Sequence, residues 1–301
     1  MKFLSSLILL CVCISVYAQD HLFFSPSKIS ALLDSYNAEE RGWIARDLTA
    51  IRGVCMGDQQ KRAFSQPPRY IATAGGPGAR KTTILERFLH SHPEYAHVVY
   101  VDPDQRALKF MLNTYISRSL NAYECAKSKD YDALLKQAYE KWRWASNYIA
   151  LTLMEEAFAQ QRDVAYGTTS TGAITAAFLQ SLKKAGYRIT LLLCSCEDDV
   201  WKEAIRYRNQ IQKFYQSTPE DAVEKGKLFA LRVPDYFEYA DEIHIFWSDT
   251  LYSPERLAAT VVNGKQTIHD QEALDHVIDK YQRDCLIWQK EGVSLPAFPI
   301  R

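Results

Sequence analysis

Hydrophobic and polar positions along the chain follow two alternating patterns. Short apolar runs bounded by Gly, Pro or Asp predict buried strands over residues 70–74, 97–101, 163–167, 187–195 and 242–247. Between them, apolar residues recur three and four positions apart, which predicts helices beginning near 81 and over 105–160, 172–185 and 198–213, with another opened by 217–220. Strands alternating with helices indicate an α/β fold, a three-layer α/β/α sandwich around a mainly parallel sheet.

The two ends of the chain have helical spacing without such strands. Residues 27–56 predict one or two helices, and residues 269–290 predict another. We therefore expect an N-terminal helical extension over 19–66, an α/β domain over 67–250 and a C-terminal helical extension over 251–301. The first extension is either a simple helical addition, which we favour, or a segment that covers the cleft like an inhibitory partner.

The first eighteen residues have the pattern of a signal peptide. Lys2 precedes a short apolar run, and Val16 and Ala18 occupy the −3 and −1 positions of a small-residue cleavage site. We predict cleavage between Ala18 and Gln19, and hence secretion. The alternative is an uncleaved membrane anchor, for which the run is short. No other long apolar stretch follows, so no stable membrane span is expected after cleavage.

Composition narrows the function classes. The 301 residues include 36 Lys and Arg against 36 Asp and Glu, so no overall basic excess indicates nucleic acid as a partner. Five cysteines remain beyond the predicted signal peptide, without Cys-x-x-Cys spacing. That excludes a zinc pattern and a dense disulfide framework, and leaves a single disulfide open. Cys194 and Cys196 are interpreted as buried thiols on one face of a strand.

A Gly- and Pro-rich loop between the first strand and the next helix matches the phosphate-loop motif G-x-x-x-x-G-K-[ST] at every fixed position but one, where Arg80 replaces the second Gly. Backbone N–H groups of such a loop surround phosphates, Lys81 reaches the outer phosphates, and Thr82 ligates Mg²⁺. The alternative is a Gly-rich turn that binds nothing. The predicted nucleotide-binding residues are Gly75, Gly76, Pro77, Gly78, Ala79, Arg80, Lys81, Thr82 and Thr83.

Polar residues also follow the next two strands. Asp104 is a candidate to accept a proton from a substrate hydroxyl or to hold Mg²⁺ through water, and the alternative is that it merely caps the following helix. Asp102 is a candidate second metal ligand or a helix cap. Tyr166, Thr168 and Thr169 lie in a hydroxyl-rich loop that suits a polar substrate, or they form an ordinary loop with a helix cap. Ligands of parallel sheets bind at the carboxyl ends of strands, so these loops are expected to meet.

Aromatic residues cluster in the long helical region. Trp142, Trp144 and Tyr148 are spaced closely enough to share a helix. Core packing is the favoured interpretation, and stacking against a base is the alternative.

Taken together, these motifs resemble the zeta-toxin kinases, P-loop enzymes that phosphorylate UDP-N-acetylglucosamine on a sugar hydroxyl. The resemblance covers about 68–250 and rests on the phosphate loop and, in order, on 101–104, Gly167-Thr168, 182–187, 204–207 and 217–219. It implies a P-loop NTPase-type fold, ATP and Mg²⁺ as cofactors, and a nucleotide-type small molecule as substrate. It further implies Asp104 as catalytic base, Lys81 as phosphate ligand, Thr168 in the substrate loop and Arg206 as a clamp on the transferred phosphoryl group.

Three positions depart from the family pattern. Arg80 replaces a Gly, Tyr166 stands where the family has a substrate-binding Glu, and Gln216 stands where it has a second arginine. Arg208 or Arg80 could replace that lost charge. The leading hypothesis is a secreted kinase acting as a toxin or effector on a small molecule. The alternatives are a pseudokinase that binds nucleotide or a target-cell protein, and a kinase that acts on a protein or nucleic acid.

Overall fold

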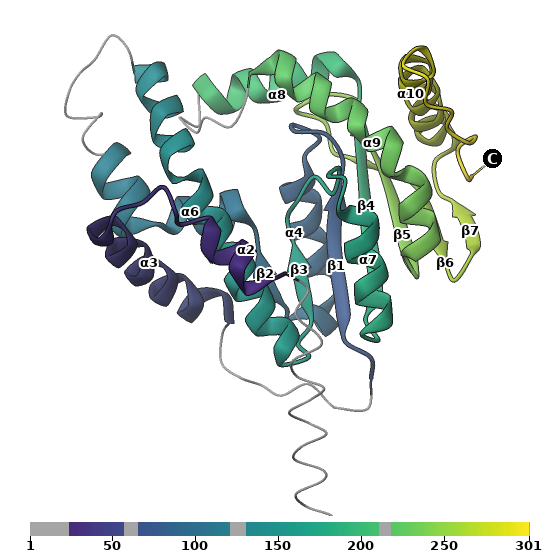
Figure 1. Ribbon diagram of the computed structural model, residues 1–301. Helices are drawn as coiled ribbons and strands as arrows, with labels where there is room; N and C mark the ends of the chain where they lie inside the picture. The colour runs from purple at the N-terminus through teal and green to yellow at the C-terminus, as the bar shows by residue number, and fades with distance from the viewer. Residues whose placement is uncertain (1–23, 57–65, 121–130, 211–217, 301) are drawn as a thin grey trace, which may run out of the picture.

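The computed structural model describes residues 24–56, 66–120, 131–210 and 218–300. At its centre lies a seven-stranded sheet of order β2-β3-β1-β4-β5-β6-β7 (Figure 1). β2, β3, β1, β4 and β5 are mutually parallel, and β6 and β7 complete the sheet in antiparallel pairing. The strands are β1 (Arg69–Ala74), β2 (Val99–Val101), β3 (Val164–Tyr166), β4 (Arg188–Cys196), β5 (Glu242–Ser248), β6 (Arg256–Val262) and β7 (Lys265–Ile268).

Central strands of this sheet are buried on both faces. In β4 every residue after Arg188 is buried, which is why its sequence is a continuous apolar run rather than an alternating one. Leu191 and Leu193 face one layer of helices, and Leu192 and Cys194 face the other. Cys194 and Cys196 are thus free, buried thiols on one face, as the sequence predicted, and burial raises the pKa of Cys194 to about 12.

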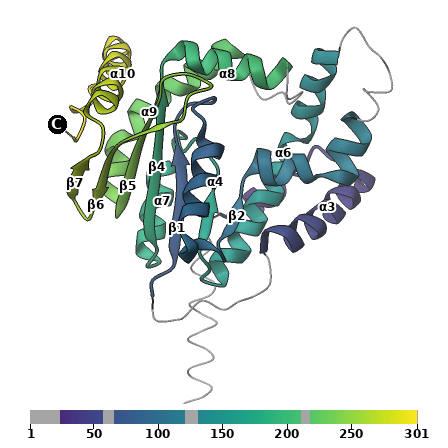
Figure 2. The same ribbon diagram turned by 180° about the vertical axis from the view of Figure 1, so that it is seen from behind.

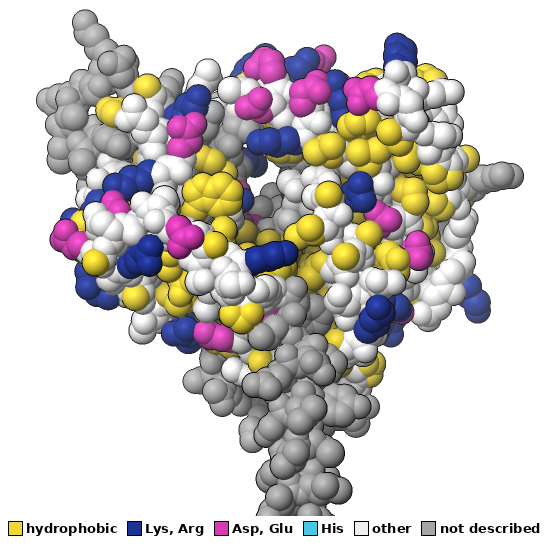
Figure 3. Space-filling model, in the orientation of Figure 1, with side chains coloured by type: hydrophobic (Ala, Val, Ile, Leu, Met, Phe, Trp, Pro, Cys, Tyr) yellow, Lys and Arg dark blue, Asp and Glu magenta, His cyan; other side chains and the backbone are white. Residues whose placement is uncertain are grey.

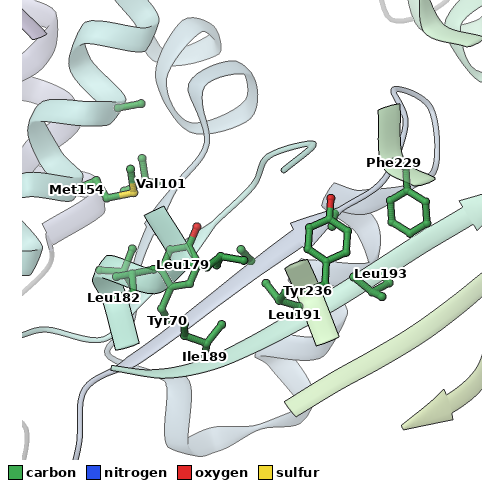
Figure 4. Packing of buried hydrophobic residues seen from close by; sticks show 14 of the residues in the cluster. Tyr70, Val101, Met154, Leu179, Leu182, Ile189, Leu191, Leu193, Phe229 and Tyr236 are labelled. Carbon is green, nitrogen blue, oxygen red and sulfur yellow. The ribbon is translucent and has the colours of Figure 1, made fainter. Parts of the chain in front are cut away.

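Helices cover the sheet on both sides (Figures 1 and 2). One layer packs Ile84, Leu85 and Trp201 against Ile71 and Leu192. The opposite layer packs Leu179, Leu182, Phe229 and Tyr236 against the strands (Figure 4). The helices of the two layers are α4 (Lys81–Ser91), α6 (Tyr131–Ala159), α7 (Thr175–Lys184), α8 (Asp198–Gln210), α9 (Pro219–Tyr239) and α10 (Gln271–Lys290), with a short 3₁₀ turn η1 (Pro93–Tyr95).

The predicted helical region over 105–160 is not one helix. Its described residues, 105–120 and 131–160, fall mainly in two π-helical segments, a 3₁₀ turn and α6. These are η2 (Pro103–Ala107), η4 (Leu112–Leu120), η3 (Leu108–Phe110) and the helix from Tyr131. Asp102 caps η2 through its side chain, which accepts from the backbone N–H of Asp104 and Gln105. This capped turn fixes the backbone immediately beside the candidate site.

The N-terminal extension contains α2 (Pro26–Ala31) and α3 (Ala38–Met56). Asp47 of α3 is fully buried and accepts hydrogen bonds from the backbone and side chain of Asn113 and from the Thr114 hydroxyl. Arg52 forms a two-pronged ion pair with Glu156 of α6 at 2.7 and 2.8 Å. These contacts hold α3 against α6 and η4, as in a helical addition to the sandwich.

The C-terminal segment differs from the prediction of a helical extension over 251–301. α10 agrees with it, but β6 and β7 were not predicted, and they extend the sheet as a hairpin. The hairpin turns at Asn263-Gly264, whose φ angles of 49° and 78° are those of the turn that this dipeptide favours. The edge strand β7 is short and exposed, and its alternation is too weak to stand out. In the described part of the chain, no helix is both long enough and apolar enough to span a bilayer.

Candidate functional site

Loops from the carboxyl ends of β1, β2 and β3 meet around one cavity of about 450 Å³, where the parallel-sheet rule places ligands. Figure 3 shows the molecule hollowed here, with Lys and Arg side chains at the upper edge of the hollow. Its lining comprises Pro77, Gly78, Arg80, Lys81, Thr82, Thr83, Asp102, Pro103, Asp104, Gln105, Lys109, Tyr139, Arg143, Asn147, Tyr166, Gly167, Thr168, Thr169, Arg208 and Lys225.

The phosphate loop connects β1 to α4. Gly75 has a φ of 143° and approaches the carbonyl oxygen of Cys194 so closely that a β-carbon would overlap it. Gly76 packs against the indole of Trp201, 2.8 Å from where a β-carbon would lie. The Lys81 ammonium donates to the Gly76 carbonyl at 2.6 Å, and burial lowers its pKa to about 8. The loop therefore presents its lysine and the N-terminus of α4 to the cavity.

Arg80 adopts the left-handed conformation that a Gly supplies elsewhere, with φ 55° and ψ 20°. That conformation costs a residue with a β-carbon roughly 1–2 kcal/mol. Its guanidinium donates to the Ser253 carbonyl and lies 3.4 Å from Glu255, whose carboxylate is buried and also pairs with Arg87. The loop after β5 thus holds Arg80 in place, and its charge is directed to Glu255.

Asp102 is the buried carboxylate of the site, with 5% of its surface exposed. Its Oδ1 accepts from the backbone N–H of Asp104 and Gln105 at 2.8 Å each. Burial, reinforced by the neighbouring Asp104, raises the pKa of Asp102 to about 6. Gly167 follows β3 directly against this carboxylate, and its N–H donates to the Val101 carbonyl at 2.9 Å.

Asp104 forms an ion pair with Arg143 of α6, and both side chains line the cavity. Arg143 was not singled out from the sequence. In the sequence, Arg143 is one of many charged residues on a long helix. Only the packing of α6 beside η2 brings it to Asp104. The pair places a carboxylate and a guanidinium together at the cavity wall.

The two arginines of α8 have different surroundings. Arg206 is exposed and does not line the cavity, so the structure does not bring this predicted residue to the other site residues. Arg208 lines the cavity, and burial lowers its pKa. Ala204 and Ile205 are buried, and Arg208 lies four and three positions after them on the same helix face. The spacing of Arg208 from these apolar residues is the sequence signal that could have favoured Arg208 over Arg206.

Hydrogen bonds join the loop that follows β3 (residues 167–171, the third loop) to β1 and to the phosphate loop. The Thr73 hydroxyl donates to the Thr168 carbonyl at 2.6 Å, and Gly75 N–H donates to the Thr169 carbonyl at 2.9 Å. The Ser170 hydroxyl donates to the Thr73 carbonyl at 2.8 Å. Tyr166 is half-buried at the cavity wall, and burial raises its pKa. The third loop is therefore fixed relative to the phosphate loop.

Oxygen donors suitable for Mg²⁺ face the same cavity. Thr82 contributes a hydroxyl and Asp102 a carboxylate, the ligand types that Mg²⁺ combines with water and phosphate oxygens. Within the described ranges, no three His, Cys, Asp or Glu side chains cluster as a protein-only metal site. The residues present fit a metal carried with a phosphate ligand better than one held by the protein alone.

An exposed pair of tyrosines borders the phosphate loop. Tyr207 of α8 and Tyr252 of the loop after β5 meet edge to face, with ring centroids 6.4 Å apart. They are 37% and 72% exposed. Tyr207 lies three residues after Ala204, whose Cβ is 3.2 Å from where a β-carbon on Gly78 would lie. Tyr252 directly precedes Ser253, whose carbonyl accepts from Arg80. Neither residue was predicted for the site.

The cavity thus collects every predicted loop residue except Gly75, Gly76 and Ala79, which hold the loop backbone, and it omits Arg206. The predicted signal peptide, Cys125 and Gln216 lie outside the described residues. Trp142 is buried as predicted, and its indole N–H donates to Ser119, whereas Trp144 is 55% exposed and the core interpretation is wrong for it.

Comparison with known proteins gives the same fold. The chain is similar to the ATP-containing crystal structure of the AvrRxo1-ORF1:ORF2 complex, with 11% identity, a TM-score of 0.58 and coverage of 91% of this chain and 92% of that one. It is also similar to the PezAT chromosomal toxin–antitoxin system of Streptococcus pneumoniae, with 16% identity, a TM-score of 0.52 and coverage of 86% and 97%. No curated protein matches the chain.

The family comparison covers the site itself. The family described as Zeta toxin matches residues 55–226, which include the phosphate loop, the two aspartates, the third loop and α8. The match spans more than half of the chain, and the sheet order and cavity place its motifs together. The chain belongs to the zeta toxin family.

Proposed function

We propose that this protein is a kinase that transfers the γ-phosphoryl group of ATP to a hydroxyl group of a small molecule. The observation that carries the proposal is the convergence of a phosphate loop, a carboxylate–arginine pair and a further arginine, Arg208, on one cavity. Phosphoryl transfer needs mainly positioning and charge neutralisation, and these residues supply both.

In the proposed reaction, Lys81 and the backbone N–H groups of the phosphate loop hold the β- and γ-phosphates. Mg²⁺, held with the nucleotide by Thr82 and Asp102, would neutralise phosphate charge. The acceptor oxygen forms a bond to the γ-phosphorus while the bond to the β-phosphate oxygen breaks and ADP leaves. The acceptor proton passes to the Asp104 carboxylate.

Arg208 takes the role that the family resemblance assigned to Arg206. Its guanidinium faces the cavity together with that of Arg143, whereas Arg206 is exposed. Two guanidinium groups near the transferred group would stabilise the charge that spreads over its equatorial oxygens. Arg143 would then supply the second guanidinium, in place of the arginine that the family has at the position of Gln216.

Tyr207 and Tyr252 are proposed to bind the nucleobase. An aromatic pair beside the phosphate loop, solvent-exposed and contributed by two different elements, offers ring faces and edges for a purine. Arg80 and Glu255 fix the loop that carries Tyr252, so this surface is positioned relative to the phosphates.

The finer identity of the protein is also a proposal. The signal-peptide pattern of residues 1–18 supports secretion, and delivery into another cell would supply the ATP that is scarce outside cells. A role as toxin or effector is supported by the family and by fold neighbours described as toxin–antitoxin assemblies. Such neighbours also favour a protein partner, and the family resemblance favours a nucleotide sugar as acceptor.

A nucleotide-binding protein without transfer activity is the second candidate. Tyr166 in place of the family's Glu favours it, because a phenol cannot bind sugar hydroxyls as a carboxylate does. The test is transfer of labelled γ-phosphate from ATP into a small-metabolite extract, with wild type beside Lys81→Ala and Asp104→Asn. A product lost in both variants supports the kinase. ATP binding in a thermal-shift assay without any labelled product supports the second candidate.

A further inference from the structure

A second cavity, which we term the apolar groove, opens next to the phosphate cavity. It has a volume of about 480 Å³, within the range of small-molecule sites. α2, α6 and α7 form its walls. Its lining comprises Phe24, Lys28, Ile29, Leu32, Tyr70, Pro103, Trp144, Asn147, Leu151, Tyr166, Thr168, Thr169, Ser170, Gly172, Ile174, Thr175, Phe178 and Leu179.

The groove is continuous with the phosphate cavity. The two share lining residues from η2, α6 and the substrate loop, namely Pro103, Asn147, Tyr166, Thr168 and Thr169. A molecule in the groove therefore reaches the side of the cavity that holds Asp104. The groove lies on the acceptor side of the site, because the phosphate-loop residues line the cavity and not the groove.

Large apolar side chains are exposed at the groove. Trp144 is 55% exposed and Ile174 is 68% exposed. Rings of Phe24, Tyr70 and Phe178 complete an aromatic lining, and two of them stack, Phe24 on Phe178 at 5.2 Å. Exposed apolar surface in a concave site is typical of ligand binding, and aromatic walls favour flat rings.

Charge in the groove is sparse and of one sign. Among the described residues that line it, Lys28 supplies the formal charge, and no carboxylate is present. A cationic ligand is therefore disfavoured, whereas a neutral or anionic one is tolerated. Tyr166, where the family has a Glu, lies at the junction of the two cavities and makes that junction aromatic.

We infer that the acceptor is an amphiphilic aromatic compound, whose hydroxyl end lies beside Asp104 and whose ring occupies the apolar groove. The inference rests on the proposed kinase function and names the class of its substrate. It differs from a fully polar sugar acceptor, for which neither the exposed Trp144 nor the exposed Ile174 would have a use.

The first test measures binding of 1-anilinonaphthalene-8-sulfonate, an aromatic anion that matches the chemistry of the groove. Binding to the protein is monitored by the fluorescence of the dye. Ile174→Asp places a carboxylate in the groove and should weaken binding about tenfold, and Trp144→Ala should weaken it by removing a ring. Leu286→Asp is the matched control, because Leu286 is 58% exposed on α10 and lies outside the groove. Equal binding by all variants would overturn the inference.

The second test identifies the acceptor class directly. A metabolite extract labelled from γ-labelled ATP is separated by reversed-phase chromatography. The expected product is retained on the column, and Ile174→Asp lowers its formation about tenfold while ATP binding persists. Labelled product found solely in the unretained polar fraction, or formed equally by Ile174→Asp, would contradict the groove assignment. No label with wild type would instead contradict the kinase proposal itself.

Discussion

A β-carbon on residue 167 would lie 2.8 Å from Cγ of Asp102, so the end of β3 and the buried carboxylate are in contact only because residue 167 is glycine. We predict that Gly167→Ala displaces Asp102, destabilises the fold by about 1–3 kcal/mol and reduces phosphoryl transfer. Gly42→Ala is the control, since a β-carbon there meets nothing within 4 Å and Gly42 lies on α3, outside both cavities. Denaturant titration and transfer assays on both variants check this, and equal behaviour of the two would contradict it.

The arginines of α8 can be separated by substitution. Arg208→Ala should lower transfer by about 10³-fold, because it removes a guanidinium from the cavity. Arg206→Ala should leave transfer nearly unchanged, because Arg206 is exposed. Single-turnover rates with γ-labelled ATP measure both. The reverse ranking would restore the role that the family resemblance gave to Arg206.

Nucleobase binding can be separated from phosphate binding. Tyr207→Ala or Tyr252→Ala should weaken ATP binding about tenfold, because each removes a ring from the proposed base site. Binding of inorganic tripolyphosphate, which lacks a base, should stay the same. Calorimetry with both ligands makes the comparison, with Tyr→Phe at each position as the control that keeps the ring. Loss of tripolyphosphate binding would mean that the variants damage the phosphate loop instead.

The strained Arg80 is predicted to depend on Glu255. Glu255→Gln removes the ion pair with Arg80, so it should destabilise the wild-type protein more than the Arg80→Gly variant. In that variant the ion pair is already absent, and glycine adopts the left-handed backbone without strain. A double-mutant cycle should give a coupling of about 1–3 kcal/mol, since both side chains are largely buried. Additive effects would show that Glu255 acts through Arg87 alone.

Binding of Mg-ATP is expected to be strongest between about pH 6 and pH 8. Below pH 6 Asp102, whose pKa is raised by burial to about 6, becomes protonated and loses its capacity to hold a metal. Above pH 8 Lys81, whose pKa is lowered by burial to about 8, becomes neutral and no longer attracts phosphates. Affinities measured across this range should lose their acid limb in Asp102→Asn. The nucleotide's own titration is common to both proteins, and an unchanged acid limb would exclude Asp102.

The raised pKa of Asp102 also predicts how the stability of the ligand-free protein depends on pH. The folded pKa of Asp102 lies above its ordinary value of 3.8, so the protonated carboxyl favours the folded state. This contribution is fully present below pH 3.8 and is lost as the pH rises through about 6. Asp102→Asn should therefore show a flatter dependence of melting temperature on pH over this interval than wild type.

Local patterns were sufficient for much of the fold. The continuous apolar run of Leu191, Leu192 and Leu193 predicts a strand buried on both faces, and a strand followed by Gly75–Gly78 and Lys81 predicts a phosphate loop. β6 and β7 were missed because their alternation is weak, although Asn263-Gly264 is a strong hairpin signal. Here the turn carried more information than the strands.

Long-range contacts within the site could not be predicted in this way. Arg143 meets Asp104 only through the packing of α6 on η2, and Glu255 reaches Arg80 from the loop between β5 and β6. Trp144 lies two residues from the buried Trp142, and a two-residue step on a helix turns to another face. The family motif supplied an arginine at the right helix, but the choice between 206 and 208 depends on which face of α8 packs inward.

The ion pair between Arg80 and Glu255 reaches beyond the segment that matches the family, residues 55–226. Residues 55–226 contain the recognisable motifs, yet the partner of the phosphate loop lies at 255 and the strand that pairs with β4 begins at Glu242. A chain cut after 226 would expose one edge of β4 and leave the left-handed Arg80 without support. The segment recognised by sequence therefore omits residues that support the phosphate loop and complete the sheet. Expression, domain grafting or truncation should keep β5 and the loop through Glu255 together with the family motifs.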